Sequence, residues 1–459
     1  MQKGTVNLTT GNVRKTMVAF AMPLFLSQLF QQLYNAVDSL IVGNILGKEA
    51  LASVSSSASL IQLLSSLMIG IALGAGVVIS RYFGAGEDKL VSDSIHTTVA
   101  FGLVAGAIMT TIGVGLSPVL LRWMNTPEDV LEGSIAYFRY YFMGAIPVML
   151  YNVFTGILNA LGDSKRPLYY LILSSILNVV LDLLFIGVFH YGVGSAAVAT
   201  AISQGVSALL CFLYLHKPGT IYQVRIHKIK FHGHLLREVV RMGLPTGIQN
   251  SVIAVANVAV QGNINSFGAN ATAACGVYNR LQGFAFLPIT SYAMALTTFV
   301  SQNLGAKQYD RARKGARFGI LTMVTMAELI GIFLAFASPL LVRLFNNDPD
   351  VIAIAVRQSR IENFFFCLLA FSHAIAGVCR GAGRSTVPMT VMLSVWCLFR
   401  IVYITVAMSI RHDIRLLFIA YPLTWIISSI IFFIYYKKSD WVHGFEAASH
   451  RGLHWPHRS

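Results

Sequence analysis

SPVLLRWMNTPEDV, residues 117–130, returns 221 residues later in the chain as SPLLVRLFNNDPDV, residues 338–351. The positions that recur include Ser, Pro, Arg, Asn, Asp and Val: Ser117, Pro118, Arg122, Asn125, Asp129 and Val130 match Ser338, Pro339, Arg343, Asn346, Asp350 and Val351. The same offset matches Ser80 and Gly84 with Ser301 and Gly305, and near the start of each half it grows to 222 residues. So long a register indicates an internal duplication, in which two halves share one fold.

The composition indicates that both halves lie in a membrane. Of 459 residues, 55% are hydrophobic and 12% are charged, and the mean hydropathy is +0.65. Soluble domains hold roughly a quarter charged residues, so a water-soluble enzyme is excluded. Apolar stretches of about 20 residues, enough to cross a bilayer, predict an all-α polytopic protein with twelve transmembrane helices, near 17–42, 52–80, 95–121, 136–161, 168–189, 194–215, 243–267, 279–302, 316–342, 362–380, 387–410 and 415–436.

Six helices per half is an even number, so both halves enter the membrane from the same side. This predicts two six-helix bundles related by a pseudo-twofold axis along the membrane normal, which alternate access by moving against each other. The expected divisions are an N-terminal bundle, a cytoplasmic connector, a C-terminal bundle and a cytoplasmic tail, at residues 1–216, 217–242, 243–437 and 438–459.

The basic residues predict the orientation. The two termini and the loops on their side of the membrane hold 24 of the 34 Lys and Arg residues. Both termini of this multi-pass protein are therefore expected in the cytoplasm, at the cell membrane. Anionic lipid headgroups account for the net charge of +15, so no nucleic-acid partner is expected.

Four segments carry a resemblance to a known family. NAVDSLIVGNILGKEALASVS (35–55), GAGVVISRYFGAG (74–86), GILNALGDSKRP (156–167) and SILNVVLDLLFIG (175–187) resemble the multidrug and toxic compound extrusion (MATE) transporters. The resemblance implies a secondary active exporter of organic cations, driven by inward H⁺ or Na⁺, and it is closer to the DinF-type branch than to the NorM-type branch. It matches Asp38, Asn178, Asp182 and Thr200 to the family's ion-coupling positions, and Tyr34, Tyr137 and Asn152 to polar neighbours.

The residues themselves also point to Asp38 and Asp182, because an ionised group inside a membrane span costs several kcal/mol. Asp38 shares a helical face with Tyr34 and Gln31, and Asp182 shares one with Asn178. Two nearby carboxylates in a low-dielectric environment cannot both remain ionised cheaply, which suits a proton. Their oxygens equally suit Na⁺, and a purely structural role paired with a basic residue is the remaining alternative.

The second half does not repeat this set. It has Ala259 or Val260 in place of Asp38, Phe399 for Asn178, Tyr403 for Asp182 and Tyr421 for Thr200. Glu328 is expected to be the mid-span acid of this half, either as a second coupling site or as a partner of Arg400. His373 occupies the repeat position of Asn152, where a hydrogen-bonded neutral imidazole is favoured over a proton relay.

The seventh predicted span suggests the substrate. Its amides, including Gln249, Asn250 and Asn257, offer hydrogen bonds to varied ligands, or alternatively join helices. With abundant Phe and Met they favour lipophilic organic cations. The NorM-type branch carries acids in spans 7 and 10, where this chain has Gln249, Asn250 and His373.

The remaining expectations concern function class. GxxxxGK[ST] is absent, so we expect no nucleotide cofactor. We further expect no metal beyond Na⁺, no enzymatic activity and a monomer. A flippase for lipid-linked saccharides is the alternative function.

Overall fold

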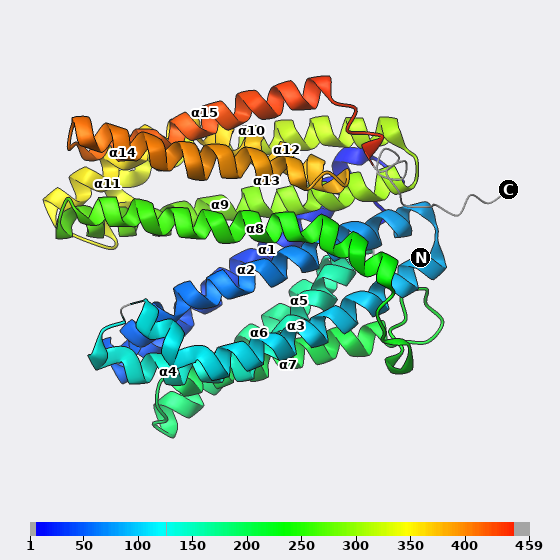
Figure 1. The fold of residues 1–459 in the computed structure, drawn as a ribbon, viewed down its shortest axis with the longest axis horizontal. Helices are drawn as coiled ribbons and strands as arrows, with labels where there is room; N and C mark the ends of the chain where they lie inside the picture. Colours follow the sequence, from blue (N-terminus) through cyan, green and yellow to red (C-terminus); the bar gives the residue numbers. More distant parts are fainter. Residues whose placement is uncertain (1–5, 125, 445–459) are drawn as a thin grey trace. The chain divides into compact units, whose positions relative to one another are not determined.

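The chain folds entirely into helices. The computed structural model describes residues 6–124 and 126–444, and these ranges contain no β-strand (Figure 1). The elements, of which η1, η2 and η5 are π-helical and η3 and η4 are 3₁₀ turns, are α1 Val13–Ile41, η1 Val42–Leu46, α2 Lys48–Ala85, α3 Asp88–Trp123, α4 Glu128–Met143, α5 Ala145–Ala160, α6 Lys165–Asp182, η2 Leu183–Val188, α7 Gly194–Leu215, η3 Ile226–Lys228, α8 Gly233–Asn265, α9 Ala269–Gly305, α10 Tyr309–Arg343, α11 Pro349–Glu362, η4 Asn363–Phe365, α12 Phe366–Gly381, α13 Thr386–Met392, η5 Leu393–Phe399, α14 Arg400–Ile410 and α15 Ile414–Lys438. The predicted all-α class is confirmed.

The predicted order of spans is confirmed as well. Ten continuous helical stretches of the described chain are long and apolar enough to cross a membrane, and α4 with α5, bent by 51°, makes an eleventh. The remaining predicted span, 243–267, corresponds to α8, a less apolar helix of 33 residues. This helix begins at Gly233, so the last part of the predicted 217–242 connector is helical rather than a loop.

The helices form two compact units. Among the described residues, unit 1 comprises 6–7 and 22–247 and unit 2 comprises 8–21 and 248–444. The beginning of α1 thus belongs to unit 2, and the beginning of α8 belongs to unit 1. The predicted tail 438–459 lies mostly outside the described residues.

A glycine seam joins α2 and α8 within unit 1. A Cβ atom on Gly74 would lie 2.3 Å from the backbone nitrogen of Gly243, and one on Gly70 would lie 2.3 Å from that of Gly247. These separations are too short for any side chain, so the two backbones are in direct contact. Leu235 and Val239 of α8 complete the adjoining hydrophobic core.

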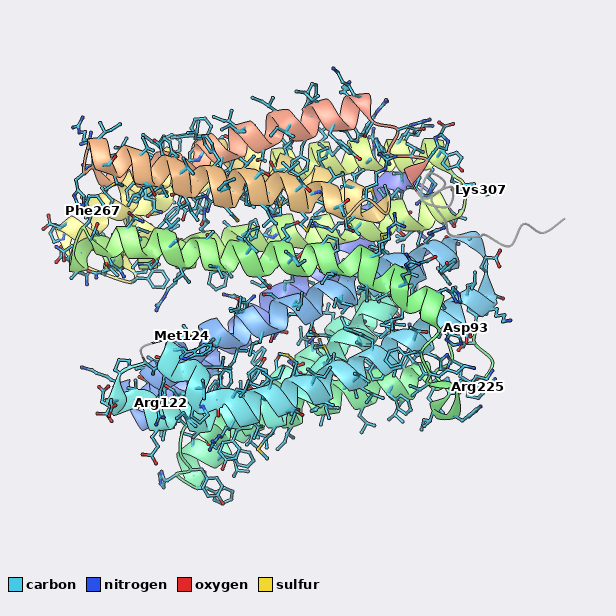
Figure 2. All side chains as sticks on the ribbon, in the orientation of Figure 1. Asp93, Arg122, Met124, Arg225, Phe267 and Lys307 are labelled. Carbon is cyan, nitrogen blue, oxygen red and sulfur yellow. The ribbon has the colours of Figure 1, made fainter. Side chains whose placement is uncertain are left out.

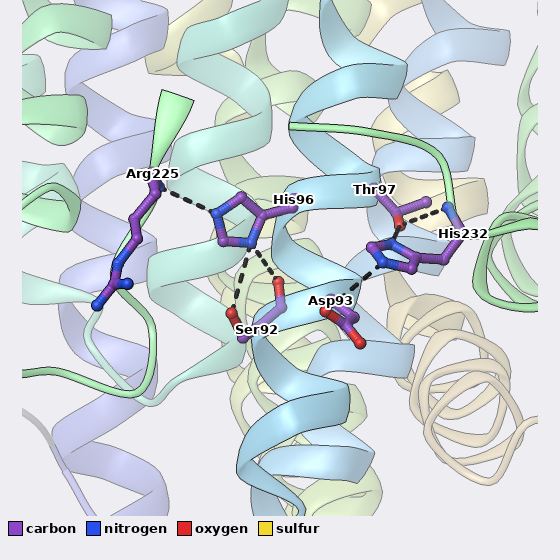
Figure 3. A network of polar contacts seen from close by, with 6 residues as sticks. All are labelled: Ser92, Asp93, His96, Thr97, Arg225 and His232. Carbon is purple, nitrogen blue, oxygen red and sulfur yellow. Dashed lines mark hydrogen bonds and ion pairs between the residues drawn. The ribbon is translucent and has the colours of Figure 1, made fainter. Parts of the chain in front are cut away.

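The connector before α8 is fastened to α3 (Figure 3). The Arg225 backbone N–H donates to His96 Nε2 at 3.0 Å, and the His232 backbone N–H donates to Thr97 Oγ1 at 3.2 Å. The His232 ring lies 3.0 Å from the same Oγ1 and 3.6 Å from Asp93. We call His96, Thr97, Asp93, Arg225 and His232 the connector clasp.

The segment before α1 is hydrogen-bonded to the helices of unit 2. Arg311 of α10 donates to the backbone oxygens of Leu8, Thr10 and Gly11, and Asn303 of α9 also donates to Leu8. Figure 2 shows Lys307 and Phe267 at opposite ends of this unit. The segment before α1 is therefore anchored at the Lys307 end.

The outer face of α10 has the character of a lipid-facing surface. Its most exposed large residues are apolar and follow helical spacing: Leu321, Leu329, Phe333, Phe336, Leu340 and Leu344 are each more than 60% exposed. A ridge of this kind is costly in water but favourable in hydrocarbon.

Candidate cation site in unit 1

Two carboxyl groups meet inside unit 1. Asp38 of α1 is 8% exposed and Asp182, the last residue of α6, is fully buried. Each aspartate lies within electrostatic range of the other, and two adjacent carboxylates in a low-dielectric interior repel each other when both are ionised. Asp38 Oδ1 and both Asp182 oxygens have no hydrogen-bond partner among the described residues. The pair therefore retains unused capacity to accept a proton or ligate a cation.

An amide and a hydroxyl extend this pair. The Asn178 amide, one turn before Asp182, is buried and donates to Thr200 Oγ1 of α7 at 3.4 Å. Asn178 Oδ1 has no donor in the described part of the chain. The structure thus brings oxygen atoms from α1, α6 and α7 into one interior region, an oxygen-only set of the type that binds H⁺ or Na⁺.

Tyrosines, rather than cations, surround the carboxyl pair. Tyr34, one turn before Asp38, and Tyr137 of α4 are both buried within electrostatic range of the two aspartates. No Lys or Arg forms an ion pair with either aspartate among the residues described. Arg139, the intramembrane cation of this half, is exposed and donates to Ser117 at 3.0 Å.

The two other predicted residues of this half contribute less directly. Gln31 is half-buried on α1, two turns before Asp38. The Asn152 amide of α5 donates to the Val148 carbonyl oxygen in its own helix at 2.9 Å.

Three π-helical segments lie next to the charged residues. η2 begins directly after Asp182, η1 begins four residues after Asp38 and contacts η2, and η5 ends directly before Arg400. π-Helical segments loosen the i→i+4 hydrogen-bond ladder and occur frequently at functional sites. Nothing in the hydrophobic pattern of the sequence predicted them.

Unit 2 holds a buried acid that the sequence reasoning missed. Glu362, the last residue of α11, is 1% exposed, and it accepts from Gln358 Nε2 at 2.9 Å and from Gln282 Nε2 at 3.3 Å. Tyr278 and Asn363 continue this network with a 2.9 Å hydrogen bond. The span predicted at 362–380 begins at Glu362, and a charged residue at the end of a span does not by itself indicate a buried acid. Gln358 one turn earlier was the signal that the polar face is internal.

The expected pair of Glu328 with Arg400 is not formed. Glu328 Oε2 accepts from the backbone N–H of Cys367 at 3.0 Å, in the first turn of α12, where a carboxylate is favoured by the helix dipole. Arg400 instead donates to Asn257 Oδ1 of α8 at 3.4 Å. Glu328 is half-buried, so Glu362, not Glu328, is the deeply buried acid of this half.

The remaining predicted residues of unit 2 lie in or near local contacts. His373 Nδ1 lies 3.0 Å from the Leu369 carbonyl oxygen, and its ring meets the edge of Phe286, as a neutral imidazole would. Gln249 Nε2 donates to Met392 Sδ at 2.9 Å, and Asn250 is half-buried.

A cavity of about 850 Å³ opens in unit 1 between α2, α4 and α7. Its lining combines carboxylates and aromatic rings: Glu49, Asp129, Glu132, Tyr140, Phe185 and Tyr191. Phe185 lies in η2, so the cavity reaches the segment that follows Asp182.

Comparisons with known proteins agree with this architecture. The MatE family model matches residues 23–184 and 245–406, one match in each half. The probable multidrug resistance proteins YoeA and YpnP of Bacillus subtilis (strain 168) are 30% and 28% identical, over 93% and 95% of this chain and 94% and 97% of theirs. A crystal structure of MATE in the bent conformation has a TM-score of 0.89 at 22% identity, covering 98% of this chain and all of that one.

Proposed function

Because this chain belongs to the MatE family of multidrug efflux transporters, we propose that it is a secondary active exporter in which Asp38 and Asp182 carry the coupling cation. Inward movement of H⁺ or Na⁺ drives outward movement of organic, predominantly cationic, compounds. Asn178 and Thr200 supply further oxygen ligands, and the match to the DinF-type branch at these four positions is part of the proposal.

The observation that carries the proposal is the buried carboxyl pair with unfilled acceptor atoms. Buried polar atoms are nearly always hydrogen-bonded, so three unused oxygens on two adjacent aspartates are unusual. A proton or a dehydrated Na⁺ would satisfy them. The neighbouring tyrosines and amides are uncharged and therefore do not neutralise the aspartates.

The lining of the unit 1 cavity supports cationic substrates. Carboxylates at Glu49, Asp129 and Glu132 attract positive charge, and the rings of Tyr140 and Tyr191 offer cation–π contacts to it. Flat lipophilic cations carry the positive charge that the carboxylates attract and present a surface that can lie against the aromatic rings.

The proposed cycle is alternating access by the two bundles, 1–216 and 243–437, with the connector 217–242, both termini and the tail 438–459 in the cytoplasm. The positive-inside distribution of Lys and Arg supports this orientation. The protein works as a monomer at the cell membrane, in contact with lipids, without an organic cofactor and without enzymatic turnover. The flippase alternative is less favoured, because the matched relatives YoeA and YpnP are described as multidrug resistance proteins.

The test is gradient-driven efflux of a cationic dye from proteoliposomes containing the full chain. An imposed pH gradient or Na⁺ gradient, applied separately, identifies the coupling ion. Asp38→Asn keeps the shape of the side chain but cannot carry a proton, so gradient-driven efflux should fall to the level of protein-free vesicles while the dye still binds. Full coupled transport by this variant would place the coupling site elsewhere.

A further inference from the structure

Unit 2 contains a buried guanidinium with unused donors. Arg400, the first residue of α14, is 3% exposed. Its Nε has no hydrogen-bond partner among the described residues, and its Nη1 reaches Asn257 only at 3.4 Å. Because Arg cannot lose its proton in a protein, this site holds a permanent positive charge with spare N–H groups.

Aromatic rings cover the face of the guanidinium. Its central carbon lies 4.6 Å from the Tyr421 ring centroid and 6.0 Å from that of Trp396. Cation–π contacts of this kind stabilise a cation that lacks an anionic partner. They occupy the face of the group and leave the in-plane N–H edges, which bind carboxylates and phosphates bidentately.

The nearby acid does not occupy those edges. Glu362 is held by two neutral donors, Gln358 and Gln282. No carboxylate oxygen lies within 4 Å of Arg400 in the described chain, although the two charges interact at longer range. The buried cation is thus not consumed by an internal ion pair.

The site also reaches the surface of unit 2. Asn257, which accepts from Arg400, is exposed on α8, and Tyr421 is only half-buried. A ligand can therefore contact the guanidinium edge beside Asn257 by displacing a long, weak hydrogen bond.

We propose that Arg400 binds the carboxylate of organic substrates that carry an acid group, with Tyr421 and Asn257 forming the sides of the subsite. A zwitterion is the best-matched ligand, because its own cation compensates the added negative charge near Glu362. The inference rests on the proposed export function for calling the ligand a substrate, but it concerns binding and can be measured without a gradient.

Two rhodamines make the test specific. Rhodamine 110 carries a free carboxylate, and rhodamine 123 is its methyl ester, so the two dyes share one ring system and differ in the acid group. Binding of each to the full-length protein, in detergent free of anionic lipid at pH 7.5, is followed by fluorescence anisotropy. Arg400→Gln should weaken rhodamine 110 binding by about tenfold or more, the effect of losing charge-assisted hydrogen bonds, and change rhodamine 123 binding less than about twofold.

The controls separate charge from packing. Arg139→Gln removes an exposed Arg from unit 1 and should leave both dyes unaffected. An equal loss for both dyes in Arg400→Gln, or no loss for either, would overturn the proposal. Should Arg400→Gln not fold, Arg400→Lys is used instead, because it retains the charge and should keep the preference for rhodamine 110. Wild-type protein that binds rhodamine 110 ten times more weakly than rhodamine 123 would contradict the subsite. Rhodamine 110 binding does not require Asp38, so failure of coupling in Asp38→Asn and failure of this subsite remain distinguishable.

Discussion

The polar interiors of the two units carry different charged groups. Tyr137, which lies within electrostatic range of Asp38 and Asp182, and Tyr141 occupy the repeat positions of Gln358 and Glu362 in unit 2. Unit 1 buries Asp38 and Asp182 without an ion-pair partner among the described residues, as well as Arg81 and Asp163, which pairs with Arg166, whereas unit 2 buries Glu362 and Arg400. The two regions come from the same part of the sequence repeat, but they differ in the charge of the ligand that they would attract.

This difference indicates that the two halves kept the helix geometry of the duplicated unit, whereas the charged side chains in their interiors diverged. Glycines at helix ends recur in both halves, Gly47 with Gly268 and Gly162 with Gly383, because their positive φ favours glycine. The two aspartates of the candidate cation site do not recur, since unit 2 has Ala259 or Val260 in place of Asp38 and Tyr403 in place of Asp182. A second copy would be free to acquire another role.

The largest expected effect tests whether coupling is confined to unit 1. Asp182→Asn should reduce gradient-driven dye efflux to the level of protein-free liposomes, since the amide has no proton to exchange and no charge for Na⁺. The matched control is Tyr403→Phe, at the repeat position in unit 2, which should retain most of the wild-type rate. Equal losses in the two variants would show that both units couple.

Sequence reasoning located the unit 1 residues because each property was local. Asp38 with Tyr34, and Asp182 with Asn178, are one helical turn apart, so the hydrophobic pattern alone places them on shared faces. The twelve helices followed from the same pattern. The membership of residues 8–21 in unit 2 and 233–247 in unit 1 could not be predicted, because it depends on long-range packing such as the glycine seam.

The second effect concerns that seam, which unit 2 lacks. At the repeat positions of Gly70 and Gly74 unit 2 has Ser291 and Ala295. Gly74→Ala places a Cβ 2.3 Å from the Gly243 nitrogen and should destabilise the protein by about 1–3 kcal/mol, as overpacking typically does. Gly76→Ala in the same helix meets no atom closer than 3.9 Å, so its thermal unfolding midpoint should be unchanged.

Charged residues of unit 2 were harder to assign from sequence. Glu328 lies in the middle of α10, as expected, but its carboxylate accepts from the Cys367 N–H in the first turn of α12 and forms no ion pair with Arg400. Which residue a mid-span acid meets depends on the rotation of neighbouring helices, and a one-dimensional pattern does not contain that rotation. Glu362 was overlooked for the related reason that span ends are uncertain by several residues.

The third effect concerns the connector clasp, which also belongs to unit 1 alone. The repeat positions of His96 and Thr97 are Arg317 and Phe318, which cannot reproduce the clasp. Thr97→Val removes the acceptor of the His232 N–H and should cost about 1 kcal/mol locally, which is about fivefold faster amide exchange over residues 225–232. Thr111→Val, whose hydroxyl bonds only within its own exposed helix turn, is the control. Unchanged exchange in Thr97→Val would mean that the connector is held by other contacts.

The smallest expected effect separates two descriptions of unit 2. Since Glu328 and Arg400 make no ion pair, the double change Glu328→Gln with Arg400→Gln should alter thermal stability by the sum of the single changes, within about 0.5 kcal/mol. A direct pair would instead give a double variant more stable than that sum, because each single change would leave one buried charge uncompensated. The positive control is Glu362→Gln with Gln358→Leu, whose side chains are 2.9 Å apart and should therefore be non-additive. Additive effects for the Glu328 and Arg400 pair, together with non-additive effects for the Glu362 and Gln358 pair, would show that Glu328 does not neutralise Arg400. The charge of Arg400 would then be available to a ligand.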